Sequence, residues 1–330
     1  MLGNQKLSLV KIKKLAQEDL QKMDAIISER LQLKEQLVKD VTYHIINSGG
    51  KRLRPVLTIL SAKLFGYSQG VRHINLAAAV EFIHTATLLH DDVVDHSKLR
   101  RGLPTANKNW DNKSSILVGD FLFSQAFLLM SEDGNLDILK ILSKASSIIA
   151  EGEVKQLSSI ANLDQSVEAY FKIISAKTAE LFAASCQVGA CIAINNHETQ
   201  LAMYNFGYNL GIAFQIMDDV LDYTSNESAL GKNIGDDFME GKVTLPIIVA
   251  YSRSNQQEKE FWQKAFVHSS TSEDFSKALE ILNKYNIIEE CLETAFKYTQ
   301  AAKKCIETAP DNYIKAALIE ILNFSISRDF

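Results

Sequence analysis

Two short acidic segments hold the residues best suited to chemistry. LLHDDVVD at 88–95 and QIMDDVLD at 215–222 each contain two adjacent aspartates and a third aspartate three residues later. In a helix, the first and last aspartates of each segment share one face, where like charges are destabilising unless a cation compensates. A solvated acidic face, with Arg100 and Arg101 as ion-pair partners, would explain one such segment. Two copies favour a shared site.

Two helices that face each other across a cavity would bring five or six carboxylates together. Oxygen ligands, with no cysteine or second histidine at metal-binding spacing, favour Mg²⁺, which bridges carboxylates to the phosphates of a substrate. His90 is therefore assigned to local packing or hydrogen bonding. Asp236 and Asp237 either extend the second metal site or cap the segment that follows. The expected metal ligands are Asp91, Asp92, Asp95, Asp218, Asp219 and Asp222.

Basic residues lie beside glycines and beside the acidic segments. Each alone is more typical of a solvated surface charge, but together they suit a diphosphate, whose oxygens need several cationic donors. His84 and Gln215, each upstream of an acidic segment in an apolar helix, are either hydrogen-bonded core groups or part of the pocket. The basic candidates are Lys51, Arg52 and Arg54 in GGKRLRP, then Arg100, Arg101, Lys177 (with Thr178), Lys232 and Lys242.

The elements that position these residues are expected to be helices. Only four prolines interrupt 330 residues, 46% of the residues are hydrophobic, and long segments show helical periodicity, so we expect an all-α fold with a large core. No linker or repeat divides the chain, which predicts one domain over 1–330.

Composition excludes several classes of protein. A net charge of −5 gives no support to nucleic-acid binding. The basic N-terminal segment resembles an amphipathic helix rather than a signal peptide, and the longest apolar stretch, residues 77–90, is too short and too polar to cross a membrane. The four cysteines have no metal-binding spacing and suit a reducing compartment. We therefore expect a cytoplasmic protein without a transmembrane segment.

The motifs, taken in order, resemble the trans-isoprenyl diphosphate synthases, also called polyprenyl synthetases. The resemblance covers nearly the whole chain and is strongest to bacterial members that make octaprenyl diphosphate. It implies antiparallel helices around a deep central cavity, usually in a homodimer. The matching blocks are GGKRLRP, EFIHTATLLHDDVVDHSKLRRG, AEGEVKQL, SAKTAELF, FQIMDDVLD and GKNIGDDFMEGKVTLP.

The resemblance also implies roles for the site residues. The cofactor is Mg²⁺, as three ions with substrate bound. Asp91, Asp95, Lys177, Asp218 and Lys232 are the expected catalytic residues. The allylic diphosphate would contact Arg100, Lys177, Thr178, Gln215 and Lys232, and isopentenyl diphosphate would contact Lys51, Arg54, His84 and Arg101.

The implied reaction is repeated head-to-tail condensation. The allylic diphosphate, which we expect to be farnesyl diphosphate, ionises, its cation is attacked by the double bond of isopentenyl diphosphate, and loss of a proton gives the longer product. An octaprenyl product would serve as a quinone side chain, as in ubiquinone biosynthesis, with transient membrane contact at release.

Product length depends on the depth of the cavity. Ala86 and Thr87, one turn before Asp91, are small and would leave a tunnel open, so we expect Ala86→Phe to shorten the product. The other candidates for the tunnel wall are Ile83, Phe127, Met130 and Leu142, which ordinary core packing would explain equally well.

Three alternatives remain. A synthase of shorter, geranylgeranyl or farnesyl, products would share every motif. A terpene cyclase would share the first acidic motif, but the second motif here is DDVLD and GGKRLRP is intact. A non-catalytic subunit of a heteromeric synthase would be expected to lack acidic motifs, and both are complete.

Overall fold

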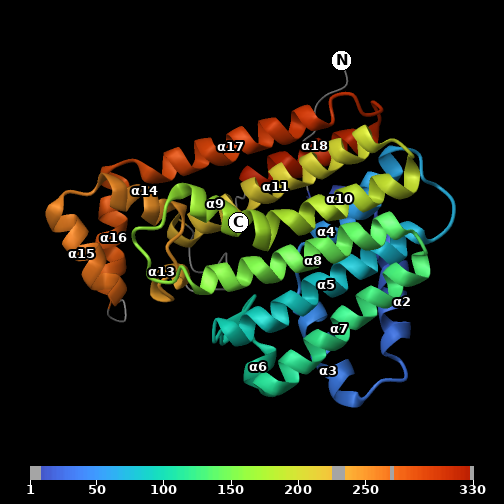
Figure 1. The fold of residues 1–330 in the computed structure, drawn as a ribbon, viewed down its shortest axis with the longest axis horizontal. Helices are drawn as coiled ribbons and strands as arrows, with labels where there is room; N and C mark the ends of the chain where they lie inside the picture. The colour runs from blue at the N-terminus through green and yellow to red at the C-terminus, as the bar shows by residue number, and fades with distance from the viewer. Residues whose placement is uncertain (1–8, 225–234, 268–270, 328–330) are drawn as a thin grey trace.

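The computed structural model describes residues 9–224, 235–267 and 271–327, and helices build this part of the chain (Figure 1). In the described part, the only sheet is an antiparallel pair of two-residue strands, β1 (Leu99–Arg100) and β2 (Leu103–Pro104). The predicted all-α fold is confirmed. The single domain over 1–330 stays a prediction.

The first half of the chain supplies the layer that carries the first acidic motif. Within it, α5 packs against α2, α4 and α7, and the three aspartates lie at its C-terminal end. The helices are α1 (Leu9–Leu15), α2 (Gln17–Leu31), α3 (Gln36–Asn47), α4 (Leu53–Leu64), α5 (Arg72–Val94), α6 (Ala106–Asn109), α7 (Asn112–Asp133) and α8 (Leu136–Leu157).

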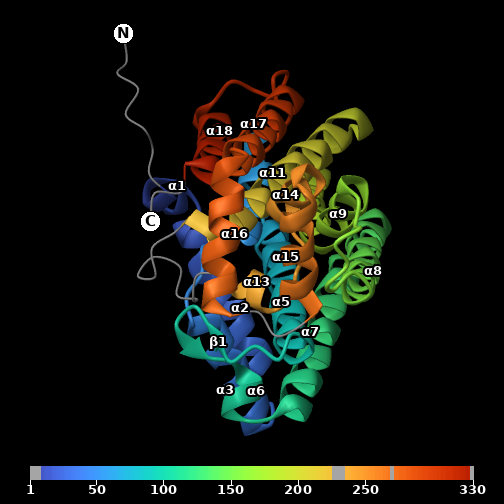
Figure 2. The ribbon, with the colours of Figure 1, turned by 90° about the vertical axis from the view of Figure 1, so that its left-hand side faces the viewer.

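The second half carries the second acidic motif at the end of α11. There α10 packs against α4, α8 and α11, and α11 also packs against α17. Figure 1 shows α14, α15 and α16 at one end of the bundle, and in Figure 2 this end faces the viewer. The elements are α9 (Val167–Ile174), the π-helical turn η1 (Ser175–Ala179), α10 (Glu180–Ala193), α11 (His197–Thr224), α13 (Asp236–Met239), α14 (Leu245–Arg253), α15 (Gln256–Val267), α16 (Ser272–Lys284), α17 (Ile287–Cys305) and α18 (Tyr313–Ile326).

Local sequence explains where the helices that flank α5 begin and end. Asp111 caps α7 by accepting a hydrogen bond from the Ser114 amide at 2.6 Å, and Gly134 forms the C-cap of α7, where its φ of 70° suits a residue without a side chain. Asn135 then caps α8 by accepting from the Asp137 and Ile138 amides. The sharp turn between α7 and α8 makes the two helices neighbours.

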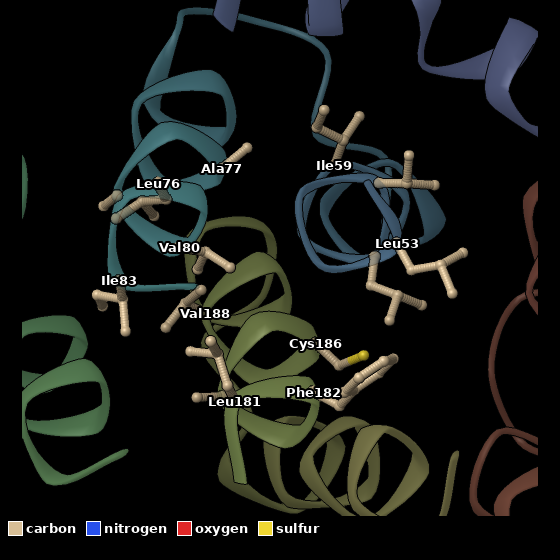
Figure 3. Close-up of a cluster of buried hydrophobic side chains, with 14 of the residues drawn as sticks. Leu53, Ile59, Leu76, Ala77, Val80, Ile83, Leu181, Phe182, Cys186 and Val188 are labelled. Carbon is tan, nitrogen blue, oxygen red and sulfur yellow. The ribbon is translucent and has the colours of Figure 1, made fainter. Parts of the chain in front are cut away.

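The core explains why α5 reads as apolar around most of its circumference. Ile83 and Val80 of α5 are fully buried, and Figure 3 shows them beside α10, whose Phe182 points towards α4. Burying this much apolar surface, at about 25 cal/mol per Å², fixes both motif-bearing helices in a rigid frame.

One helix departs from the sequence expectation about membranes. In the described part of the chain, α7 is long and apolar enough to cross a membrane by length and composition alone. The longest apolar stretch of the sequence, residues 77–90, which is too short and too polar to cross a membrane, lies in α5 instead. Because α7 lies against α5 and α8, and about half of it is buried inside the protein, a core helix explains its composition equally well.

Candidate active site

One large cavity, of about 680 Å³, opens between α5, α8, η1, α10 and α11. Both acidic motifs and the GGKRLRP loop contribute to its wall. The predicted site residues that line it are Lys51, Arg54, His84, Thr87, Asp91, Asp95, Arg100, Arg101, Lys177, Thr178, Gln215, Asp218, Asp219 and Asp222. Lys232 lies outside the described residues.

The carboxylates of the first motif face lysines from distant segments. Lys177 Nζ lies 3.5 Å from Asp91 Oδ2, and Lys242 Nζ lies 2.9 Å from Asp95 Oδ2. Asp92 differs, because it is 1% exposed and does not line the cavity. Its carboxylate accepts hydrogen bonds from Arg100, with Nη2 at 2.7 Å, and so fixes this arginine at the rim. These cations compensate the repulsion expected between neighbouring aspartates.

The second motif is tied into a hydrogen-bonded chain. The Thr178 hydroxyl donates to Gln215 Oε1 at 2.7 Å, Gln215 donates to Asp219 at 2.8 Å, and Tyr170 donates to the other oxygen of Asp219 at 2.6 Å. Burial, with the charges of Asp237 and Asp218, raises the pKa of Asp219 to about 8, although its two hydrogen bonds lower it. Asp219 therefore holds the second motif in place through its hydrogen bonds with Gln215 and Tyr170.

Lys177 and Thr178 are presented by the π-helical turn η1. Two glycines let neighbouring helices approach this turn: a Cβ on Gly152 would lie 2.7 Å from the Ala176 Cβ, and one on Gly211 would lie 2.5 Å from the Ala179 Cα. A π-helical turn contains one residue more than an α-helical turn, and such turns inside α-helices are frequent at functional sites. Here the turn aims Lys177 and Thr178 into the cavity.

A separate group of cations occupies the other side of the cavity. Arg54 is partly buried, its guanidinium lies 4.5 Å from the centre of the Phe182 ring, and it donates to His84 Nε2 at 3.2 Å. Burial lowers the pKa of Arg54 to about 10 and lowers that of His84 well below its usual value, so His84 is neutral and accepts this bond. The Nε atom of Arg54 has no hydrogen-bond partner among the described residues. A buried guanidinium nitrogen without a partner suits an anionic ligand.

Sequence reasoning missed Glu153 and Tyr170 in this wall, whereas it had named Asp237 as a possible part of the second acidic site. Glu153 accepts from Lys177 at 2.8 Å, and burial with the neighbouring Asp91 raises its pKa to about 7. Asp237, at the start of α13, lines the cavity and extends the acidic wall, and its backbone amide donates to the Asp222 carboxylate, which thereby caps this short helix. Glu153 follows a glycine in AEGEVKQL, which was a usable signal, whereas nothing in the sequence marked Tyr170.

The proposed tunnel residues are only partly in place. Thr87 lines the cavity, whose apolar wall also includes Leu88, Ile149 and Phe182. Phe127 is 42% exposed on the outer side of α7 and does not line the cavity, because the chain turns its side chain away from α5. The remaining candidates are buried in the core and do not line the cavity, namely Ile83, Ala86, Met130 and Leu142.

The donor set fits Mg²⁺ bound together with a diphosphate. Among the described residues, no three carboxylate, histidine or cysteine groups converge closely enough to hold an ion by themselves. Mg²⁺ does not need such a cage, because it keeps several waters and binds through one or two carboxylates plus phosphate oxygens. Asp91 and Asp95 on one wall, and Asp218 and Asp222 on the other, offer carboxylates of this kind.

Comparison with known proteins identifies the family. The polyprenyl synthetase family model matches residues 35–282. The chain belongs to this family. A polyprenyl synthetase of Haemophilus influenzae, octaprenyl diphosphate synthase, is 39% identical over 98% of both chains. The predicted family and prenyl-transferring activity are confirmed.

Solved structures agree. A polyprenyl synthase from Caulobacter crescentus, crystallised with calcium and isoprenyl diphosphate, has a TM-score of 0.94 at 43% identity and is matched over 99% of this chain and 100% of its own. A decaprenyl diphosphate synthase from Rhodobacter capsulatus has a TM-score of 0.92 at 42% identity, over 97% and 99%. The chain is a long-chain trans-polyprenyl synthetase by these comparisons.

Proposed function

We propose that this enzyme extends farnesyl diphosphate with isopentenyl diphosphate to an octaprenyl diphosphate for a quinone side chain. One observation carries the proposal: two acidic motifs and a separate arginine group share one cavity, and an apolar wall continues from it towards the core. Acidic walls suit a metal-bound diphosphate, and the arginine group suits a second diphosphate.

The aspartates and the lysines of the acidic walls would have different roles. Mg²⁺, when bound, supplies positive charge at the departing diphosphate. Asp91, Asp95, Asp218 and Asp222 would hold the ions, and Lys177 and Lys242, now paired with aspartates, would donate to the oxygens of the same diphosphate as its C–O bond breaks.

Arg54, Arg101, Lys51 and His84 would hold isopentenyl diphosphate with its double bond against the allylic cation, and the released diphosphate would take the proton. The apolar wall at Thr87 and Ile149 would then guide the growing tail away from water. Because the side chains beyond that wall are closely packed, a long tail needs them to move apart.

Product length is the test of this proposal. Purified protein is incubated with farnesyl diphosphate and labelled isopentenyl diphosphate, with and without Mg²⁺, and the products are dephosphorylated and sized. A magnesium-dependent series ending at eight isoprene units supports the proposal. Products of three or four units would make the enzyme a short-chain synthase, and no incorporation would leave a non-catalytic subunit.

We also propose that the enzyme acts as a homodimer in the cytoplasm, with membrane contact only at product release. The support is an apolar face of α7 and the start of α8, where Leu117, Phe127, Leu128 and Leu136 are between 42% and 66% exposed. Such a face is typical of an interface between subunits. Sedimentation of the wild type and of Leu117→Asp tests it: a dimer that dissociates in the variant supports the proposal, and a wild-type monomer refutes it.

A further inference from the structure

Three consecutive residues of the GGKRLRP loop are held by helices that lie outside the stretch matched by the family model. Lys13 of α1 donates to the Gly50 carbonyl at 3.3 Å. The Lys51 ammonium lies 5.2 Å from the centre of the Phe324 ring in α18. Arg52 donates from one nitrogen to both carboxylate oxygens of Asp24 in α2, at 2.6 and 2.9 Å. The matched stretch is 35–282, so all three holding residues are external to it.

The backbone of the loop needs such support. Arg52, the residue before α4, has φ of 49°, a left-handed conformation that a residue with a side chain adopts only when its surroundings impose it. Gly50, with φ of 134°, lies so close to Arg101 that a Cβ there would be 2.7 Å from the guanidinium. The Arg101 guanidinium also donates to the Gly49 carbonyl. The loop is thus strained on one side and packed against a substrate-binding candidate on the other.

The charges on and around the loop make its position important for the binding of an anion. Glu81 of α5 is buried in the cavity wall, and its Oε2 has no hydrogen-bond partner among the described residues. The guanidinium groups of Arg52, Arg54 and Arg101 all act on this carboxylate. Arg52 therefore interacts with two carboxylates, the buried Glu81 in the cavity wall and the half-exposed Asp24. Without Asp24, we expect Arg52 to turn towards Glu81, which would relax the left-handed turn and shift Lys51 and Arg54.

We propose that Asp24, assisted by Lys13 and Phe324, is a positioning residue that sets the affinity for isopentenyl diphosphate without touching it. This inference rests on the proposed function, because it assigns the loop to that substrate. The terminal helices thereby act on one substrate only, since the lysines that face the acidic motifs are on η1 and in the segment after α13.

Steady-state kinetics of Asp24→Asn tests the inference. The KM for isopentenyl diphosphate should rise about tenfold, while the KM for farnesyl diphosphate and the kcat at saturating isopentenyl diphosphate change by less than about twofold. Asp24→Glu keeps the charge and should recover part of the affinity. Phe324→Leu removes the ring under Lys51 and should raise the same KM by about threefold.

Glu132→Gln is the matched control, because it breaks a different ion pair of α2, between Arg30 and Glu132, which does not involve the loop. Its kinetics should equal those of the wild type. An unchanged KM for isopentenyl diphosphate in a folded Asp24→Asn overturns the inference, as does an equal rise in both KM values. If Asp24→Asn does not fold, the same criteria apply to Phe324→Leu and Lys13→Met. A wild type that condenses nothing refutes the proposed function instead.

Discussion

Lys242 Nζ lies 2.9 Å from Asp95 Oδ2, although the two residues are 147 positions apart in the chain. The ion pair joins the segment after the second acidic motif to the end of the first, across the mouth of the cavity. Burial opposes the charge on Lys242, but Asp237, Asp95 and Glu240 outweigh it and raise its pKa, so the lysine stays protonated. Lys242 can therefore move from a carboxylate to a diphosphate without changing its charge.

Lys242→Gln should lower kcat/KM for the allylic substrate by about 100-fold, because it removes a partly buried cation from the position where negative charge develops. Lys242→Arg keeps the charge and should retain most of the activity. Initial rates over a range of allylic-substrate concentrations, with circular dichroism to confirm the fold, measure the effect. A glutamine variant as active as the wild type would mean that Lys242 serves only to neutralise Asp95.

Asp218→Asn should raise the Mg²⁺ concentration needed for half-maximal rate by about tenfold or more, because it replaces a charged oxygen ligand by a neutral one. Titrating the rate with MgCl₂ measures this shift. Asp164→Asn, at an exposed aspartate outside the cavity wall, is the control and should leave the titration unchanged. If the rate of both variants depended on the Mg²⁺ concentration in the same way, Asp218 would not be a metal ligand.

Thr87→Phe should shorten the product, because Thr87 lines the apolar part of the cavity and a phenyl ring would block the path beyond it. Thr87→Val keeps the size and should leave product length unchanged. Ala86 is fully buried and does not line the cavity, so Ala86→Phe should also destabilise the protein by about 1–3 kcal/mol through overpacking. Product sizing and thermal unfolding separate the two effects. A full-length product from Thr87→Phe would place the tunnel elsewhere.

Asp19→Asn should lower the stability at pH 7 by about 2 kcal/mol. Burial raises the pKa of Asp19, but hydrogen bonds from His73 and Lys63 lower it further, to about 2. Because the folded pKa is below the unfolded value of 3.8, this stabilisation is complete above about pH 4 and is lost as the pH falls towards 2. Urea unfolding at pH 7, 4 and 3 should show the gap to the wild type narrowing. A gap that is constant with pH would contradict the ionic origin of the effect.

The helical fold and most of the cavity wall were predictable, because short motifs carry both residue type and spacing. The DDxxD segments fixed which aspartates share a helical face, and Asp91 and Asp95 do line the cavity together. Asp92 was less predictable: its spacing suits a ligand, but only the hairpin that returns Arg100 to it shows that it holds this arginine.

Other features depend on packing that no local pattern encodes. Tyr170 reaches Asp219 from α9, 49 positions away, and an isolated tyrosine gives no sign of such a partner. Phe127 has the residue type of a tunnel wall, yet it lies on the face of α7 that is exposed. Helical periodicity predicts that a face exists, and tertiary contacts decide what covers it.

The π-helical turn at Ser175–Ala179 constrains how this enzyme can be altered. In a π-helical turn, five residues cover about the same rotation as four residues of an α-helix, so the turn accommodates one extra residue while α10 keeps its direction. Deleting one residue would restore a regular helix and leave Phe182 under Arg54 and α10 against α4. The deletion would instead remove the bulge that presents Lys177 and Thr178, so it would disturb the acidic side of the cavity and spare the arginine side.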